Sequence, residues 1–285
     1  MSTKILVLGA NGQLGKSIKE YISIHKIDGD FIFTTRTEID ITDFAKLENT
    51  IKSIQPSYII NCTAYTAVDK AESELEQANL INNIAVGKLA QISKVYGCTL
   101  IHISTDFVFD GTKNTPLIED EKCIPLGAYG KTKFDGEQAI IQNLESYFII
   151  RTSWLYSSIG ANFFTNISKY ARDRVSLNIV YDQVGTPTYT MDLVETIFNI
   201  ILSKSNSFGI YHYSNEGVCS WYDFAKELVS MQKIECDILP ILSAQYPTPA
   251  KRPAYSVMDK NKIKSTFGIQ IPHWRESLGN VIANL

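Results

Sequence analysis

A tyrosine and a lysine one helical turn apart are the residues in this sequence best suited to acid–base chemistry. Tyr129 and Lys133 stand at positions i and i+4 of the segment Y-G-K-T-K, so a helix would present both side chains on one face. A free phenol has a pKa of about 10 and is a weak acid or base at neutral pH. Because a neighbouring ammonium favours the phenolate, we expect Lys133 to lower the pKa of Tyr129.

The pattern Y-x-x-x-K is weak evidence by itself, because the sequence holds a second copy of it. Tyr222 and Lys226 have the same spacing, but they fall in a late amphipathic segment with no matching buried strand before it. Tyr129 instead follows a glycine-rich loop and a strand that ends in Ser104-Thr105-Asp106. Open α/β sheets bind ligands at such carboxyl ends. We therefore predict that Tyr129 is catalytic and that Tyr222 is a packing residue.

A glycine-rich loop early in the chain predicts a site for a dinucleotide. Gly9, Gly12 and Gly15 have the spacing G-x-x-G-x-x-G, directly after an apolar strand and at the start of a helix. Gly9 would permit a tight turn, Gly12 would let the backbone approach a pyrophosphate, and Gly15 would let the helix pack on the strand. The phosphates would then lie over the helix N-terminus, where backbone N–H groups point at them.

The phosphate loop of a nucleotide triphosphatase is a competing interpretation of the same segment. Residues 10–17 nearly match G-x-x-x-x-G-K-[ST], with Ala10 in place of the first glycine and Lys16-Ser17 at the end. Asp106 could then imitate a magnesium-binding acid. The missing glycine argues against this interpretation, and so does the tyrosine–lysine pair, which a triphosphatase does not use.

The end of the second predicted strand bears on which dinucleotide binds. An acidic residue there favours NAD, whereas an arginine accommodates the 2′-phosphate of NADP. This strand ends in Thr34-Thr35-Arg36, and the next carboxylates, Glu38 and Asp40, come later. We therefore expect NADP(H) as the preferred cofactor, with NAD(H) possible, and we expect Arg36 to contact the 2′-phosphate.

The elements that must position these residues alternate through the first half of the chain. We predict strands at residues 4–8, 31–35, 58–62, 98–104 and 147–151, and helices at 13–26, 43–54, 74–96 and 130–143. Alternation of this kind is typical of parallel strands joined by crossover helices. The predicted fold class is therefore α/β, a doubly wound parallel sheet of the Rossmann type that binds NAD(P).

The pattern loosens after about residue 155, where proline and tyrosine become more frequent. We expect residues 1–155 to form an NADP(H)-binding domain. Residues 156–285 should form mainly a smaller substrate lobe, with some segments returning to the first domain. No Gly/Ser-rich or Pro-rich linker separates the two halves, so they should share a cleft.

The overall composition excludes several classes of protein. The 285 residues hold 27 Lys and Arg against 30 Asp and Glu, a net charge of −3, with no basic stripe for nucleic acid. Five cysteines without a C-x-x-C pair or metal-ligand spacing fit a reducing compartment. No apolar run reaches the roughly 18 residues of a membrane span. We expect a cytoplasmic protein that binds neither membranes nor nucleic acid.

Segments with distinctive residues are spread over nearly the whole chain. They are Gly9–Gly15, D-I-T-D at 40–43, N-C-T-A-Y-T-A-V-D-K-A-E at 61–72, S-T-D-F-V-F-D-G at 104–111, Tyr129–Lys133, R-T-S-W-L-Y at 151–156, D-Q-V-G-T-P-T at 182–188 and Arg252-Pro253. In these residues the chain resembles the extended short-chain dehydrogenase/reductases, and within them the dTDP-4-dehydrorhamnose reductase family.

The resemblance implies a role for each matching residue. Tyr129 would be the proton donor, Lys133 would hold the nicotinamide ribose and tune Tyr129, and Thr105 would assist the tyrosine. The cofactor would lie against Gly12, Gln13 and Leu14 at its pyrophosphate, Asp40 and Ile41 at its adenine, and Thr63, Ala64 and Tyr65 at its middle. The sugar nucleotide would touch Thr105, Asp106 and Trp154.

The implied reaction is reduction of the C4 ketone of dTDP-4-dehydro-L-rhamnose to dTDP-L-rhamnose. NAD(P)H would supply hydride while Tyr129 protonates the developing alkoxide. The small-molecule partner would be a dTDP-linked ketosugar, and the chain would act as a monomer or homodimer.

The chain departs from the family pattern in two places. Phe107 stands where the family more often has tyrosine, which removes a possible hydroxyl contact with the substrate. Some members dimerise around magnesium held by glutamates, but Lys16-Ser17 occupies the early region here, and we expect no metal. The four histidines (His25, His102, His212 and His273) are scattered, and we expect ordinary surface or core residues.

Two further interpretations stay open beside the triphosphatase. The substrate could be another nucleotide-linked ketosugar, because these residues define the chemistry better than the sugar. A non-catalytic regulatory subunit that binds NADP also resembles this family, although the set Tyr129, Lys133 and Thr105 argues against it.

Overall fold

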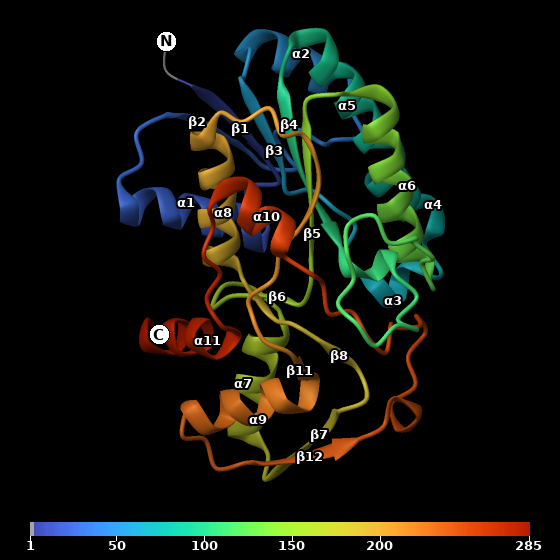
Figure 1. Cartoon of the computed structure of the whole chain (residues 1–285), viewed down its shortest axis with the longest axis vertical. Coiled ribbons are helices and arrows are strands. Elements are labelled where there is room, and N and C mark those ends of the chain that lie inside the picture. The colour runs from blue at the N-terminus through green and yellow to red at the C-terminus, as the bar shows by residue number, and fades with distance from the viewer. Residues whose placement is uncertain (1–2) are drawn as a thin grey trace.

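A six-stranded parallel sheet lies at the centre of the computed structural model, which describes residues 3–285 (Figure 1). The strand order is β10-β5-β4-β3-β1-β2, and every neighbouring pair is parallel. The strands are β1 Lys4–Leu8, β2 Asp30–Thr34, β3 Tyr58–Asn61, β4 Thr99–Thr105, β5 Tyr147–Thr152 and β10 Gly209–His212. The predicted α/β fold, a doubly wound parallel sheet of the Rossmann type, is confirmed.

Helices cover both faces of the sheet because its strands are apolar on both sides. In β1, Ile5 and Val7 face one core cluster, while Leu6 and Leu8 face the other. The first cluster is closed by α1 Gln13–His25, α8 Thr190–Ser203 and α10 Asn261–Phe267. The second is closed by α2 Phe44–Ile54, α5 Ala85–Tyr96 and α6 Ala128–Asn143.

The single helix predicted at residues 74–96 is wrong in one respect, because it is interrupted. It consists of α4 Leu75–Asn79, a π-helical turn η1 Leu80–Ile84, and α5. Within this turn the buried Asn82 side chain accepts the Tyr65 N–H at 2.8 Å, and donates to the Tyr65 carbonyl at 3.1 Å and the Thr132 hydroxyl at 3.2 Å. Such turns often mark functional sites, and this one ties the loop after β3 to α6. A short helix α3 Val68–Ala71 lies in that loop.

A smaller group of elements packs at the carboxyl ends of the sheet strands, in the lower half of Figure 1. Its core joins aromatic and aliphatic residues of α7 Phe163–Asp173, α9 Trp221–Met231 and α11 Trp274–Ala283. Three two-stranded pairs complete it: β7 Ser176–Val180 with β12 Asp237–Ile241, β8 Val184–Gly185 with β11 Cys219–Ser220, and β6 Leu155–Tyr156 with β9 Thr188–Tyr189. Single 3₁₀ turns lie at η2 Asp106–Val108 and η3 Ser243–Gln245.

Three elements from the second half of the chain lie on the large sheet and its helices. β10 pairs with β5, and α8 and α10 pack into the first core cluster. The division at residue 155 stays a prediction. Among residues 3–285 no helix has the length and apolar character needed to cross a bilayer.

Candidate active site

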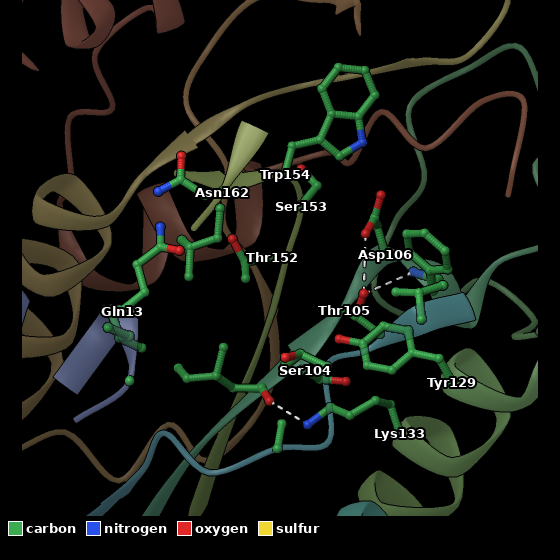
Figure 2. Close-up of a pocket in the computed structure, with 18 of the residues that line it drawn as sticks. Gln13, Ser104, Thr105, Asp106, Tyr129, Lys133, Thr152, Ser153, Trp154 and Asn162 are labelled. Atoms are coloured by element: carbon green, nitrogen blue, oxygen red, sulfur yellow. Dashed lines mark hydrogen bonds between the residues drawn. The ribbon is translucent and has the colours of Figure 1, made fainter. Parts of the chain in front are cut away.

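The first turns of α6 carry the tyrosine and the lysine. The helix begins at Ala128, whose backbone N–H donates to Glu72 Oε1 at 2.8 Å. Gly130 lies so close to the Phe107 carbonyl that a Cβ there would collide with it, and this fixes the helix against η2. Tyr129 and Lys133 both extend from α6 toward the end of β4 (Figure 2). The predicted i, i+4 placement on one helical face is therefore present.

Lys133 is the most deeply buried cation of this region, with 1% of its surface exposed. Its Nζ donates to the Ile103 carbonyl at 2.7 Å, drawn as a dashed line in Figure 2, and lies 3.1 Å from Nε2 of His102. Burial lowers the pKa of Lys133 to about 8, and the charge of Glu137 opposes that change. The ammonium is therefore much easier to deprotonate than an ordinary lysine.

Tyr129 is a phenol held in its protonated form. Its ring meets Phe107 edge to face, with centroids 5.5 Å apart. Loss of hydration raises the pKa of Tyr129 to about 12, the Thr105 hydroxyl opposes this change, and the Asp106 charge adds to it. This is the opposite of the lowered pKa expected from the sequence. The i, i+4 spacing shows that Lys133 is near, but it does not show that the phenol is buried away from water. A protonated phenol suits a proton donor.

Thr105 is the last residue of the buried strand β4 and Asp106 follows it, so both lie at the carboxyl end of this strand, as predicted. The Thr105 hydroxyl donates to Asp106 Oδ1 at 3.2 Å and accepts the Phe107 N–H at 3.2 Å. Burial raises the pKa of Asp106 to about 6, and the neighbouring Ser256 and Thr105 hydroxyls oppose this change. Asp106 Oδ2 is buried without a hydrogen-bond partner within residues 3–285. A buried acceptor of this kind is suited to a ligand hydroxyl.

These side chains line a cavity of about 580 Å³. Of the predicted site residues, the cavity wall includes Gly12, Gln13, Leu14, Thr63, Ala64, Thr105, Asp106, Tyr129, Lys133 and Trp154. A second cavity of about 200 Å³ is lined by Gly9, Gly12, Arg36, Asp40, Ile41, Thr63 and Ala64. The two walls share Gly12, Cys62, Thr63 and Ala64, so the cavities adjoin at the glycine loop.

The glycine loop has the shape that a dinucleotide pyrophosphate requires. Gly9 has φ +80°, and the N–H groups of Gly9 and Ala10 donate to the Thr34 carbonyl at 3.0 and 2.9 Å. A Cβ on Gly15 would lie 2.6 Å from Ala10 Cα, so Gly15 allows α1 to pack on the loop. Gln13 Nε2 is buried beside the cavity without a partner among the described residues. These features fit a bound pyrophosphate.

The same loop does not fit the phosphate loop of a triphosphatase. Lys16 is exposed, and the buried Ser17 hydroxyl donates to Thr190 Oγ1 at 2.8 Å. Neither residue lines either cavity. The two side chains that such a loop needs at the phosphates are therefore directed elsewhere.

The positions of Arg36 and Tyr65 differ in part from a direct contact with the cofactor. Arg36 lines the second cavity, but its side chain is 75% exposed and Nε donates to Asp40 Oδ2 at 3.1 Å. Tyr65 lines neither cavity, and its hydroxyl donates to Glu74 at 2.6 Å. Gly15 acts through packing and does not line the cavities either. Cofactor contacts of Arg36 and Tyr65 stay predictions.

Several residues of the cavity wall were not predicted as site residues. Among them are Asn61, Ser153, Asn162, Phe163, Trp221 and Arg252. Asn61, Ser153 and Arg252 fall in segments that carry the family resemblance, which was the available signal. Arg252 is bound by Asp69 through a contact of 2.9 Å. Within residues 3–285 no three His, Cys, Asp or Glu side chains gather as a metal site would require, and the expectation of no metal stays a prediction.

Comparison with known proteins gives consistent relatives over the full length. Residues 3–285 match the family described as RmlD substrate binding domain. The spore coat polysaccharide biosynthesis protein SpsK of Bacillus subtilis is 39% identical over 97% of this chain and 95% of its own. A dTDP-4-dehydrorhamnose reductase of Aggregatibacter actinomycetemcomitans is 37% identical over 98% of both chains. The structure of a dTDP-4-dehydrorhamnose reductase from Bacillus anthracis in complex with NADP has a TM-score of 0.96 and 35% identity, with 100% of both chains covered.

Proposed function

The chain belongs to the dTDP-4-dehydrorhamnose reductase family, and from this premise we propose that it reduces dTDP-4-dehydro-L-rhamnose to dTDP-L-rhamnose with NAD(P)H. The observation that carries the proposal is the placement of Tyr129 and Lys133 beside Thr105, in a cavity that reaches the glycine loop. The product would serve polysaccharide biosynthesis, the process named for the relative from Bacillus subtilis.

Tyr129 is the proton donor in this proposal. Its phenol is protonated at neutral pH because burial raises its pKa to about 12. When the ketone carbon is reduced, negative charge develops on the carbonyl oxygen, and a placed O–H donor stabilises that charge as it forms. Thr105 assists by its contact with the tyrosine hydroxyl, and Lys133 provides the nearby cation that stabilises the phenolate after proton transfer.

The sugar nucleotide would lie against Thr105, Asp106 and Trp154. Asp106 supports this placement with a buried oxygen that lacks a partner among the described residues, because a sugar hydroxyl could donate to it. Trp154 offers an indole face of the kind that packs against a sugar ring. Both line the same cavity as Tyr129, so a ketone held between them would be within the reach of the donor.

The cofactor would be held by the glycine loop and the walls of the two adjoining cavities. Gly12, Gln13 and Leu14 would face its pyrophosphate, Asp40 and Ile41 its adenine, and Thr63 and Ala64 its middle. When bound, NAD(P)H supplies the hydride. The relative from Bacillus anthracis binds NADP, which supports NADP(H) as the preferred cofactor, with NAD(H) possible. A cytoplasmic location and a monomeric or homodimeric state also stay predictions.

The proposal is tested by following NADPH oxidation with three substrates. We expect turnover with dTDP-4-dehydro-L-rhamnose and at least about tenfold lower kcat/KM with UDP- and GDP-linked 4-ketosugars, because one lost contact to a base costs about that much. Equal turnover with a UDP- or GDP-linked sugar would transfer the proposal to another ketosugar. NADPH binding without oxidation of any of them would support the non-catalytic regulatory interpretation instead.

A further inference from the structure

A buried histidine lies directly behind the active-site lysine and has no part in the function proposed above. His102 of β4 is fully buried, and Asn61 of β3 is its register partner on the neighbouring strand. The Asn61 amide nitrogen lies 3.1 Å from His102 Nδ1, and Lys133 Nζ lies 3.1 Å from His102 Nε2. The imidazole thus connects an asparagine to the lysine that faces the cavity.

The orientation of the Asn61 amide is fixed from the other side. The Thr63 backbone N–H points to Asn61 Oδ1 at 3.0 Å, and a backbone N–H can only donate. The Thr63 hydroxyl also donates to this oxygen. Because the oxygen must face Thr63, the amide NH₂ must face His102, and Nδ1 of the imidazole must accept its hydrogen bond.

A neutral imidazole has one N–H and one lone pair. With the lone pair of Nδ1 directed to Asn61, the proton resides on Nε2 and points at Lys133 Nζ. An ammonium has three donors and no acceptor, so it would place a donor against a donor. A neutral amine instead accepts this proton through its lone pair and still donates to the Ile103 carbonyl at 2.7 Å.

We infer that His102 is a positioning residue of the active site: by presenting its Nε2 proton to Lys133 Nζ, it favours the neutral amine of Lys133 over the ammonium and directs the nitrogen at the Ile103 carbonyl. The consequence for catalysis rests on the proposed function, in which Lys133 stabilises the tyrosine. The ammonium that the proposed function uses forms at the expense of the His102 hydrogen bond, so His102 makes Lys133 easier to deprotonate. The charge beside Tyr129 therefore depends on the hydrogen bonds that connect Asn61, His102 and Lys133.

The surrounding charges are consistent with this assignment. Burial lowers the pKa of His102 well below its usual value, and Lys133 adds to the effect, so the imidazole is neutral. On α6 the charged group that acts on Lys133 is Glu137, and Arg151 of β5 pairs with it at 2.7 Å. Beyond β3, burial raises the pKa of Cys62 to about 12, so that thiol is neutral. Tyr129 from α6 and Asp106 from η2 also face the cavity.

The tautomer can be measured without any assumption about the reaction. The full chain is labelled with ¹⁵N-histidine, and the resonances of its four histidines are assigned by replacing each in turn. At about pH 7 we expect His102 to show a protonated Nε2 and an unprotonated Nδ1, because its pKa is lowered and its Nδ1 accepts. A protonated Nδ1 would overturn the inference, and this measurement holds even if the protein reduces no ketosugar.

Asn61→Asp reverses the direction of the hydrogen bonds from residue 61 through His102 to Lys133, and so tests how they affect the charge of Lys133. A carboxylate can still accept from Thr63, but it also demands a proton on His102 Nδ1, which leaves the Nε2 lone pair to accept from an ammonium. We expect the alkaline fall of kcat/KM for NADPH-dependent reduction to move up by at least about one pH unit, with the Nδ1–H tautomer visible by NMR. An unmoved alkaline limb in a folded Asn61→Asp enzyme would contradict the inference.

Asn143→Asp is the matched control, since it adds one carboxylate to the far end of α6, ten residues beyond Lys133. We expect it to leave both the His102 tautomer and the alkaline limb in place. If it moved the limb as far as Asn61→Asp does, the effect would be one of net charge, and the assigned role of His102 would be wrong. If no variant and no wild-type enzyme oxidised NADPH, the proposed function would fail while the tautomer result stood.

Discussion

The Trp154 indole lies flat on the Trp221 indole, with ring centroids 3.6 Å apart and an angle of 12° between the planes. Trp154 has φ +46°, a backbone conformation that a bulky side chain rarely adopts. A Cβ on Gly185 would also lie 2.9 Å from the Trp154 ring. The indole at the cavity is thus held by contacts with a glycine of β8 and a tryptophan of α9.

We predict that Trp221→Ala raises the KM for the sugar nucleotide several-fold and leaves the KM for NADPH unchanged. The stacked pair contributes about 0.5–1.5 kcal/mol beyond area burial, so its loss frees Trp154 from the orientation that faces the substrate. Trp154→Phe should act in the same direction. Steady-state kinetics in each substrate measures both effects. Trp154 would be a core residue, without a substrate contact, if Trp154→Phe lowered the melting temperature and kept both KM values.

Arg36→Ala should raise the KM for NADPH several-fold and change the KM for NADH little. A guanidinium forms a charge-assisted contact with a 2′-phosphate, and NADH has no such group. Arg36 is already paired with Asp40 at 3.1 Å, and hydrogen bonds from Thr42 help to lower the pKa of Asp40, which keeps it charged. If Arg36 served only to hold Asp40 near the adenine, the variant would weaken both cofactors equally, and the prediction would be wrong.

Glu137→Gln should destabilise the fold far more than loss of any exposed ion pair. Arg151 is 2% exposed and donates twice to Glu137, at 2.7 Å from Nη2 and 3.0 Å from Nε, and Ser104 also donates to this carboxylate. Breaking a buried pair leaves an uncompensated charge, at a cost of about 3–5 kcal/mol. Thermal unfolding should show a fall of several degrees.

The matched control on the same helix is Lys131→Ala. It removes an exposed i, i+4 pair with Asp135 at 2.9 Å, which contributes about 0.3–0.5 kcal/mol. Similar melting temperatures for the two variants would contradict the prediction, because they would mean that the buried pair stabilises the fold no more than the exposed pair does.

Much of the sheet could be predicted from the sequence because the strands buried on both faces leave continuous apolar runs. The end of β4 and the i, i+4 pair on α6 then follow from the order of the elements. β10 was missed, since an edge strand of four residues, Gly209–His212, has no such run. The π turn was missed as well, because it depends on the hydrogen bonds of Asn82 to a distant loop.

The site shows the same limit. Trp221 lies 67 positions from Trp154, and no periodicity relates them. His102 was expected to be an ordinary histidine, and only the pairing of β3 with β4 places it between Asn61 and Lys133. The direction of the Tyr129 pKa was wrong for a related reason: neighbours along a helix are visible in a sequence, whereas the loss of water around a side chain depends on the whole fold.

The pH dependence of kcat/KM should follow the lysine and not the tyrosine. Because burial lowers the pKa of Lys133 to about 8, the ammonium is lost as the pH rises through about 8. Because the pKa of Tyr129 is about 12, the phenol keeps its proton over the same range. We expect an alkaline fall that begins no later than about pH 8, and Lys133→Ala should lose rate and cofactor affinity together. A profile that stayed flat to about pH 10 would contradict this assignment.

Tyr129→Phe should bind NADPH almost normally and turn over at least about a hundredfold more slowly. Loss of a general acid costs about 10² to 10⁴ in rate, while the ring keeps its edge-to-face contact with Phe107, so the fold should be little affected. The control is Tyr222→Phe on α9, in the second Y-x-x-x-K pattern, which lines neither cavity of the site and should keep kcat within about twofold. Retention of more than about a tenth of the wild-type kcat by Tyr129→Phe would falsify the role of this hydroxyl as the proton donor, because the remaining groups could then supply the proton without it.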